Sequence, residues 1–123
     1  MTSEHYTGPW TDPIGKPLLD ESSQKGATFR DPCVFKDDDG EYYIIAGVFD
    51  YFIAKLGSDM VSLAEPLKAV TVNNPYGPCG AHTTDDKPFI HKNSGVYYLS
   101  WGCFYAMSKS VYGQVVHTKN NPP

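Results

Sequence analysis

Two aspartates stand at corresponding places in two similar stretches of this chain. The first stretch, DPCVFKDDDGEYYIIAG, begins at Asp31, and the second, DKPFIHKNSGVYYLSWG, begins at Asp86. Laid over each other from these aspartates, the stretches also match Gly40 with Gly95 and share two tyrosine pairs. Two carboxylates over one sugar can hydrolyse a glycoside, because one acid protonates the leaving oxygen while the other activates water or attacks the sugar. An aspartate before a strand also often caps a turn, so the spacing alone leaves a structural role open.

Three further residues are candidates for contacting a sugar. Asp85 neighbours Asp86, and because adjacent side chains of a strand point to opposite faces, only one of the two can face a shared site. His82 lies in the loop before the second stretch, where it could bind substrate or a metal or be an ordinary loop residue. Trp101 offers an aromatic face on which a sugar could stack, with packing in the core as the alternative.

The elements that would carry these residues are short strands joined by turns rich in Gly, Asp and Asn, among them the turn predicted at Asp37, Asp38, Asp39 and Gly40. The predicted strands are 29–36, 41–46, 51–56, 67–72, 87–92, 96–102 and 104–108. A convincing helical period is absent. Antiparallel strands that recur about every 55 residues predict blades of a β-propeller. A small barrel or a sandwich would also satisfy two such units.

We therefore predict an all-β chain of antiparallel propeller blades. Residues 1–28 would form a connector and the end of a preceding blade, and 29–72 the first complete blade. Residues 73–123 would form a second blade with a long leading loop and a truncated C-terminal end. The first strand of a propeller blade lines the central channel, so Asp31 and Asp86 would both face one cavity.

Composition excludes several other classes of function. The net charge is −4 with no basic run, which argues against nucleic acid as a partner. The chain contains no apolar run of about 20 residues, so no membrane span is predicted. The three cysteines form no CxxC pair, so neither a metal site nor a cofactor is predicted. The start of the chain shows no signal peptide, and with reduced cysteines this mildly favours a cytoplasmic location while leaving localisation undetermined.

The same residues carry a resemblance to a known family. RDPCVFKDDDGEYYIIAG, the strand and turn YFIAKLGSDMVSL, the stretch DKPFIHKNSGVYYLSWG and the connector GPWTDPIGKPL together resemble glycoside hydrolase family 43 over most of residues 8–113. The resemblance implies a five-bladed propeller that hydrolyses arabinose- or xylose-containing glycosides of plant polysaccharides with inversion.

The resemblance also implies roles for the acids. The family uses an Asp base in its first blade, an Asp in its second blade that tunes and orients the acid, and a Glu acid in its third. Asp31 falls on the second of these, and Asp86 falls on the Glu position, where Asp is one methylene shorter. Because the base position would lie upstream of Met1, we expect this chain alone to be weakly active or inactive.

Two other interpretations stay open beside the glycosidase fragment. Exposed blade edges seek partners, so copies of the chain could associate into a closed homo-oligomer that binds carbohydrate without cleaving it. The chain could also be a structural remnant with neither activity, because two blades expose faces that normally pack on neighbours.

Overall fold

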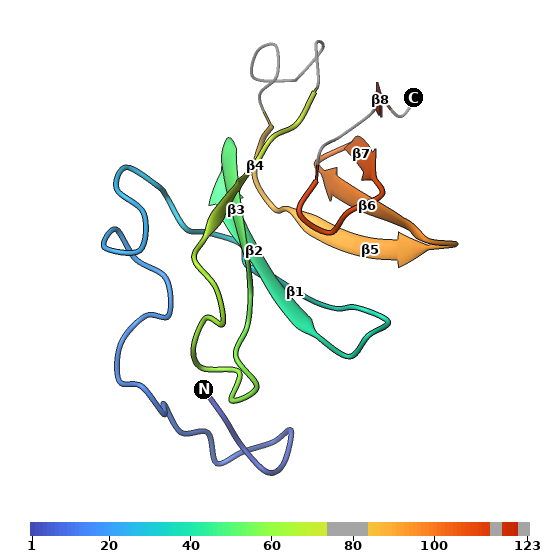
Figure 1. The fold of residues 1–123 in the computed structure, drawn as a ribbon. Coiled ribbons are helices and arrows are strands. Elements are labelled where there is room, and N and C mark those ends of the chain that lie inside the picture. The colour runs from blue at the N-terminus through green and yellow to red at the C-terminus, as the bar shows by residue number, and fades with distance from the viewer. Residues whose placement is uncertain (74–83, 114–116, 121–123) are drawn as a thin grey trace.

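The chain folds into two antiparallel β-sheets. The computed structural model describes residues 1–73, 84–113 and 117–120, and the regular elements of this part of the chain are all strands. The sheets have four strands each, in the orders β1-β2-β3-β4 and β5-β6-β7-β8, so sequential strands pair side by side (Figure 1). The strands are β1 (Cys33–Lys36), β2 (Tyr42–Val48), β3 (Asp50–Lys55), β4 (Lys68–Val70), β5 (Phe89–Asn93), β6 (Val96–Trp101), β7 (Phe104–Ser108) and β8 (His117–Asn120).

Each predicted strand is present, 104–108 with the predicted bounds and the others with shifted bounds, and one described strand was missed. The first strand begins at Cys33 rather than Phe29, and β8 pairs with β7 in a region where no strand is predicted. The sequence of β8, HTKN, has no apolar alternation, so the prediction failed there. The sheets lie within the predicted blade ranges 29–72 and 73–123, whose bounds stay a prediction.

The first sheet is built around β2, which is buried on both faces. Tyr43 and Ile45 point toward the second sheet, while Ile44 and Ala46 point to the opposite side. This follows from the alternation of side chains along a strand, here filled with aromatic and β-branched residues. The connector before β1 reaches this opposite side through Phe29, because its ring packs edge-on against Phe52 of β3 at 5.9 Å.

The two sheets share one hydrophobic core. The first sheet and the segment after it contribute Tyr43, Ile45, Tyr51, Ile53 and Val72, and the second sheet contributes Ile90, Leu99, Trp101 and Ala106. Strands β1 and β5 lie next to each other, so the first strands of the two units are neighbours (Figure 1). Burial of a large apolar side chain contributes about 1.5–3 kcal/mol, so this core is what holds the sheets together.

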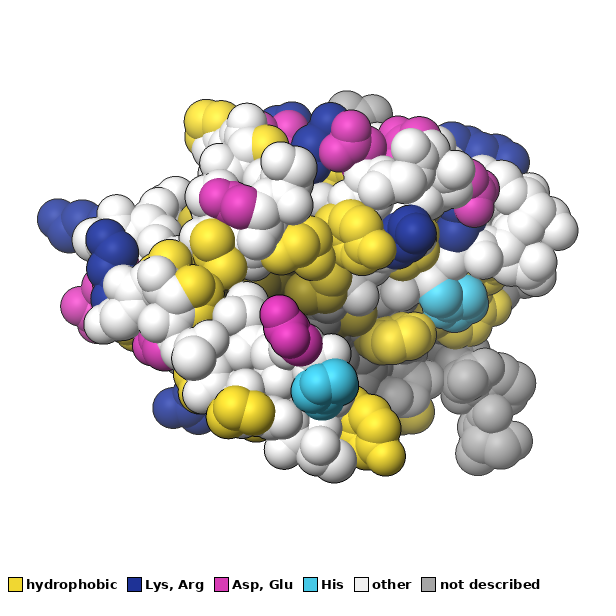
Figure 2. Space-filling view, turned by 90° about the horizontal axis from the view of Figure 1, so that it is seen from below, with side chains coloured by type: hydrophobic (Ala, Val, Ile, Leu, Met, Phe, Trp, Pro, Cys, Tyr) yellow, Lys and Arg dark blue, Asp and Glu magenta, His cyan; other side chains and the backbone are white. Residues whose placement is uncertain are grey.

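Apolar surface also remains exposed. Figure 2 shows hydrophobic side chains across the middle of one face, with basic and acidic groups around them. On the side of the second sheet away from the core, His91 stacks on Tyr98 at 5.0 Å and Phe89 is 54% exposed. The described residues contain no helix long and apolar enough to cross a membrane.

Candidate active site

The segments before β1 and before β5 bind the same part of the first sheet, which is the end of β2 and the turn that joins it to β3. The Gly47 N–H donates a hydrogen bond to the carbonyl oxygen of Arg30 at 3.2 Å. Two residues later, the Phe49 N–H donates to the carbonyl oxygen of Asp85 at 3.1 Å. The peptide groups that precede Asp31 and Asp86 are therefore brought to one end of the molecule, next to the β2–β3 turn.

Asp31 is exposed and has an unusual backbone conformation. Its φ is 49°, although it precedes Pro32. Positive φ is uncommon outside glycine, and strained positions of this kind are enriched at functional sites. Lys87, which precedes Pro88, has the same conformation with φ 58°, so the feature belongs to the opening of both sheets and is not specific to the acid.

The strand registers change the match between the two acids. Lys36 pairs with Tyr42 in the first sheet, and Lys92 pairs with Tyr97 in the second, so Lys36 and Lys92 are counterparts at the ends of the first strands. The alignment that starts from the two aspartates holds only after the first turn, because this turn is one residue longer in the first unit.

The structural counterpart of Asp31 is therefore Lys87, and Asp86 corresponds to Arg30. The two acids occupy neighbouring positions of the shared opening rather than the same one.

The third strands, β3 and β7, correspond with yet another sequence offset between the two units. Lys55 pairs with Tyr43 in the first sheet, and Met107 pairs with Tyr98 in the second, so Lys55 and Met107 are counterparts. Phe104 thus matches Phe52 of β3 and not Phe49, the residue with which a constant offset would align it.

Asp86 is half-buried and is held mainly through its backbone. Its N–H donates to Asp85 Oδ1 at 2.9 Å, and its carboxylate lies 3.9 Å from the Lys87 ammonium. Both aspartates precede β5, so the expectation that they alternate as strand residues does not apply. One oxygen of Asp85 is occupied by this local bond.

The remaining predicted sugar contacts fall in different places. Trp101 is 1% exposed and belongs to the core, where it stacks on Phe104 at 6.3 Å and contacts Tyr51 edge-on at 6.4 Å. Its rings thus do not offer a face to a sugar in this structure, and core packing, the alternative interpretation, is what we observe. His82 lies outside the described residues.

Sequence reasoning missed a charged cluster between the sheets. Asp37, expected only to form a turn, is 8% exposed and accepts hydrogen bonds from Lys92 at 2.9 Å and from the Tyr97 hydroxyl at 2.5 Å. Lys92 also lies 2.9 Å from Asp38. The Lys-Asn-Ser-Gly hairpin of the second unit gives no signal for this pairing, because it depends on how the two sheets pack.

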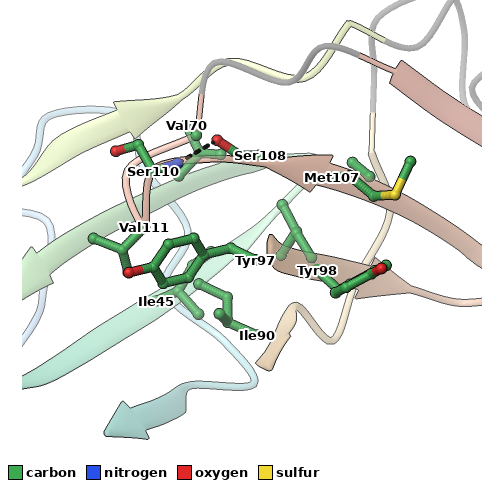
Figure 3. A pocket seen from close by; sticks show the side chains of 12 residues that line it. Ile45, Val70, Ile90, Tyr97, Tyr98, Met107, Ser108, Ser110 and Val111 are labelled. Atoms are coloured by element: carbon green, nitrogen blue, oxygen red, sulfur yellow. Dashed lines mark hydrogen bonds between the residues drawn. The ribbon is translucent and has the colours of Figure 1, made fainter. Parts of the chain in front are cut away.

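A hollow between the sheets is too small and too apolar to bind a sugar. It is lined by Ile45 and Val70 of the first sheet and by Ile90 and Tyr97 of the second, while Tyr98 and Met107 point away from it (Figure 3). Its free space is about 20 Å³, which holds about one water molecule. Among the described residues, no three His, Cys, Asp or Glu side chains cluster as metal ligands would.

Comparison with known proteins identifies the family. The model of Glycosyl hydrolases family 43 matches residues 1–123. The chain belongs to glycosyl hydrolase family 43. An arabinoxylan arabinofuranohydrolase of Bacillus subtilis is 30% identical over 142 residues, and one of Paenibacillus polymyxa is 35% identical over 113 residues. These alignments cover 100% and 82% of this chain but only 24% and 17% of the relatives, so the chain spans about a quarter of their length or less.

The fold of family 43 agrees with the two sheets. The crystal structure of the Bacillus subtilis arabinoxylan arabinofuranohydrolase in complex with cellotetraose superposes with a TM-score of 0.75 and 25% identity, over 96% of this chain and 29% of that one. The family 43 enzymes are propellers, so the two sheets are β-propeller blades. This confirms the predicted all-β propeller fold and the resemblance.

Proposed function

We propose that the protein to which this chain contributes is a glycoside hydrolase that removes arabinose or xylose residues from plant polysaccharides. The observation that carries the proposal is the family 43 match over residues 1–123. It is supported by the arabinoxylan arabinofuranohydrolases among the relatives and by the aspartates that flank the β2–β3 turn.

The proposed chemistry divides between two acids of this chain and a base from another blade. Asp86 gives its proton to the glycosidic oxygen as the bond to the anomeric carbon breaks. Asp31 orients this acid. A general base on another blade takes a proton from water, which attacks the anomeric carbon from the opposite face and inverts it.

Position 86 limits the rate in this proposal. Aspartate is one methylene shorter than the family's glutamate, so its proton lies farther from the leaving oxygen. A misplacement of about 1 Å can cost about 100-fold in rate. We expect Asp86 to act as a weak acid and Asp86→Glu to raise the rate.

A chimaera tests the proposal, because it places residues 1–123 within a whole family 43 enzyme. Residues 1–123 replace the matching segment of the Bacillus subtilis relative, and hydrolysis of arabinofuranosides and xylosides is measured. We expect turnover that falls at least about 100-fold in Asp86→Asn and rises in Asp86→Glu. The 123-residue chain alone should show little turnover. A folded chimaera in which neither substitution at position 86 changes the rate would refute the role of Asp86.

A second candidate function is carbohydrate binding without cleavage. The exposed aromatic row on the second sheet, with Phe89, His91 and Tyr98 in contact, favours it, because such faces pack on sugar rings or on another copy of the chain. Light scattering tests the closed oligomer: a discrete dimer or trimer supports it, and a monomer or a heterogeneous aggregate argues against it.

A further inference from the structure

The peptide bond between Asp85 and Asp86 is held by hydrogen bonds on both of its sides. Its carbonyl oxygen accepts from the Tyr51 hydroxyl at 2.7 Å and from the Phe49 N–H at 3.1 Å. Its N–H donates to Asp85 Oδ1 at 2.9 Å. Because a peptide group is planar, these three bonds fix the position of the Cα atom from which the Asp86 side chain starts.

Both donors to this carbonyl belong to the first sheet, not to the sheet that follows Asp86. Tyr51 is the second residue of β3 and is 2% exposed. Phe49 lies in the β2–β3 turn, and its carbonyl oxygen in turn accepts a hydrogen bond from the Thr84 hydroxyl. Thr84 is only 3% exposed, so the segment before Asp86 and the turn of the first sheet bind each other in both directions away from water.

We propose that Tyr51 is a positioning residue for Asp86, so that the first blade sets the point from which the acid carried by the second blade reaches the sugar. This inference rests on the proposed role of Asp86 as proton donor. Burial raises the pKa of Tyr51 to about 12, so the hydroxyl stays protonated and remains a donor at any pH at which a glycosidase of this kind works.

The hydrogen bond of the Tyr51 hydroxyl can be tested separately from the packing of the Tyr51 ring. It contacts Trp101 edge-on at 6.4 Å, and Tyr51→Phe keeps this contact while it removes only the donor. A matched control is Tyr43→Phe, because Tyr43 is also a buried tyrosine of the first sheet, at 5% exposure, but its ring packs on Tyr112 at 5.7 Å.

Amide hydrogen exchange of the 123-residue chain gives the first readout. In Tyr51→Phe we expect the amides of Phe49 and Asp86 to exchange about tenfold faster, since the Asp85–Asp86 peptide group, to which the Phe49 N–H donates and of which the Asp86 N–H is a part, has lost a buried donor. In Tyr43→Phe these two amides should keep their rates. Equal exchange in both variants would overturn the inference.

The leaving group gives a second readout, in the chimaera described above. A general acid matters for a poor leaving group such as methoxide and hardly at all for 2,4-dinitrophenolate, which leaves without a proton. We expect Tyr51→Phe to lower kcat for methyl arabinofuranoside about tenfold or more, with KM and the rate on the dinitrophenyl arabinofuranoside nearly unchanged.

The two readouts separate failure of the inference from failure of the proposed function. If Asp86→Asn shows the selective loss on the methyl glycoside but Tyr51→Phe behaves like Tyr43→Phe, Asp86 is the acid and Tyr51 does not position it. If Asp86→Asn lowers the rates on both substrates equally, or lowers neither rate, the proposed function of Asp86 is wrong. A merely structural role of Tyr51 would lower both rates together.

Discussion

Asp37 shows how one side chain can bind its own turn and a neighbouring sheet at the same time. Its carboxylate accepts from the Asp38 N–H at 2.8 Å within the turn, and from Lys92 and Tyr97 across the sheet boundary. Burial alone would raise the pKa of Asp37, but the hydrogen bonds from Tyr97 and Lys92 outweigh it and hold the pKa below its ordinary value of 3.8. The ionised form is therefore the one that the fold prefers.

This preference predicts a pH-dependent difference between the protein and Asp37→Asn. A carboxyl group whose pKa is lower in the folded state contributes stability above its unfolded value, and this contribution is lost as the pH falls through the folded value. We expect the free energy of unfolding of the protein to exceed that of Asp37→Asn by about 1 kcal/mol at pH 7. This difference should disappear below pH 3.8. Urea unfolding at several pH values measures it.

The matched control for this prediction is Tyr97→Phe, which removes one of the hydrogen bonds that favour the ionised form. In the Tyr97→Phe variant, Asp37→Asn should lower the free energy of unfolding at pH 7 by a smaller amount. The reason is that the pKa of Asp37 in the folded state then lies closer to its value in the unfolded state. If the protein and Asp37→Asn lose stability in parallel from pH 7 to pH 3, the cluster does not act through the charge of Asp37.

The local roles of single residues were predictable from the sequence, but their contacts with distant residues were not. The turn role of Asp37 follows from the Asp-Asp-Asp-Gly pattern, because aspartate and glycine suit tight turns. Its partner Lys92 lies far away in the sequence on another sheet, and no local pattern encodes that contact. The burial of Trp101 has the same origin, since its partner Tyr51 comes from the other sheet.

At the scale of the elements, the connection between β2 and β3 holds the segments that carry the two candidate acids. Gly47, near the end of β2, donates to Arg30, and Phe49, in the turn, donates to Asp85, so the end of β2 and this turn together hold the openings of both sheets. Gly47 has φ 142°, and a Cβ atom at this position would lie 2.1 Å from the carbonyl oxygen of Asp50. Only glycine fits there without a shift of the backbone.

Gly47→Ala is therefore expected to destabilise the fold by about 2–4 kcal/mol, from the strained φ and the overlap with the backbone together. Gly95→Ala is the control, because Gly95 also has positive φ, at 76°, but has open space where the Cβ would lie. We expect this variant to lose only about 1 kcal/mol. Urea unfolding compares the two, and equal losses would show that the close approach at Gly47 is not a constraint.

All the described strands except β8 could be predicted because they carry a local pattern, whereas their register across the repeat could not. Short runs of aromatic and aliphatic residues, YYIIAGV and VYYLSW, mark β2 and β6 directly. The match of Asp31 with Asp86 depended on assuming equal turns, but the first turn holds one residue more than the turn at Ser94 and Gly95. A slip of one residue is invisible in the identities and changes which side chain stands at each position.

At the scale of the whole molecule, the two blades are one folding unit because neither buries its inner face alone. The core joins Ile53 of the first sheet, at 0% exposure, to Trp101 of the second, at 1%. Tyr51 contacts Trp101 across the boundary and also donates to Asp85, so the same interface that stabilises the fold carries the candidate site. The energetic coupling of the blades follows from this shared interface.

This coupling predicts that a small change in the first sheet is felt in the second. In a Trp10→Phe background, Trp101 is the one remaining tryptophan, since the chain has two. Ile53→Val should cost about 1 kcal/mol and shift the urea midpoint of Trp101 fluorescence and of far-UV circular dichroism by the same amount. Val34→Ala, at a side chain of β1 that is 51% exposed, should change the free energy of unfolding by less than about 0.5 kcal/mol, so both midpoints should move less than in Ile53→Val. If Ile53→Val splits the circular dichroism transition in two while the Trp101 midpoint stays in place, the blades fold independently, and positioning of Asp86 by the first blade loses its structural basis.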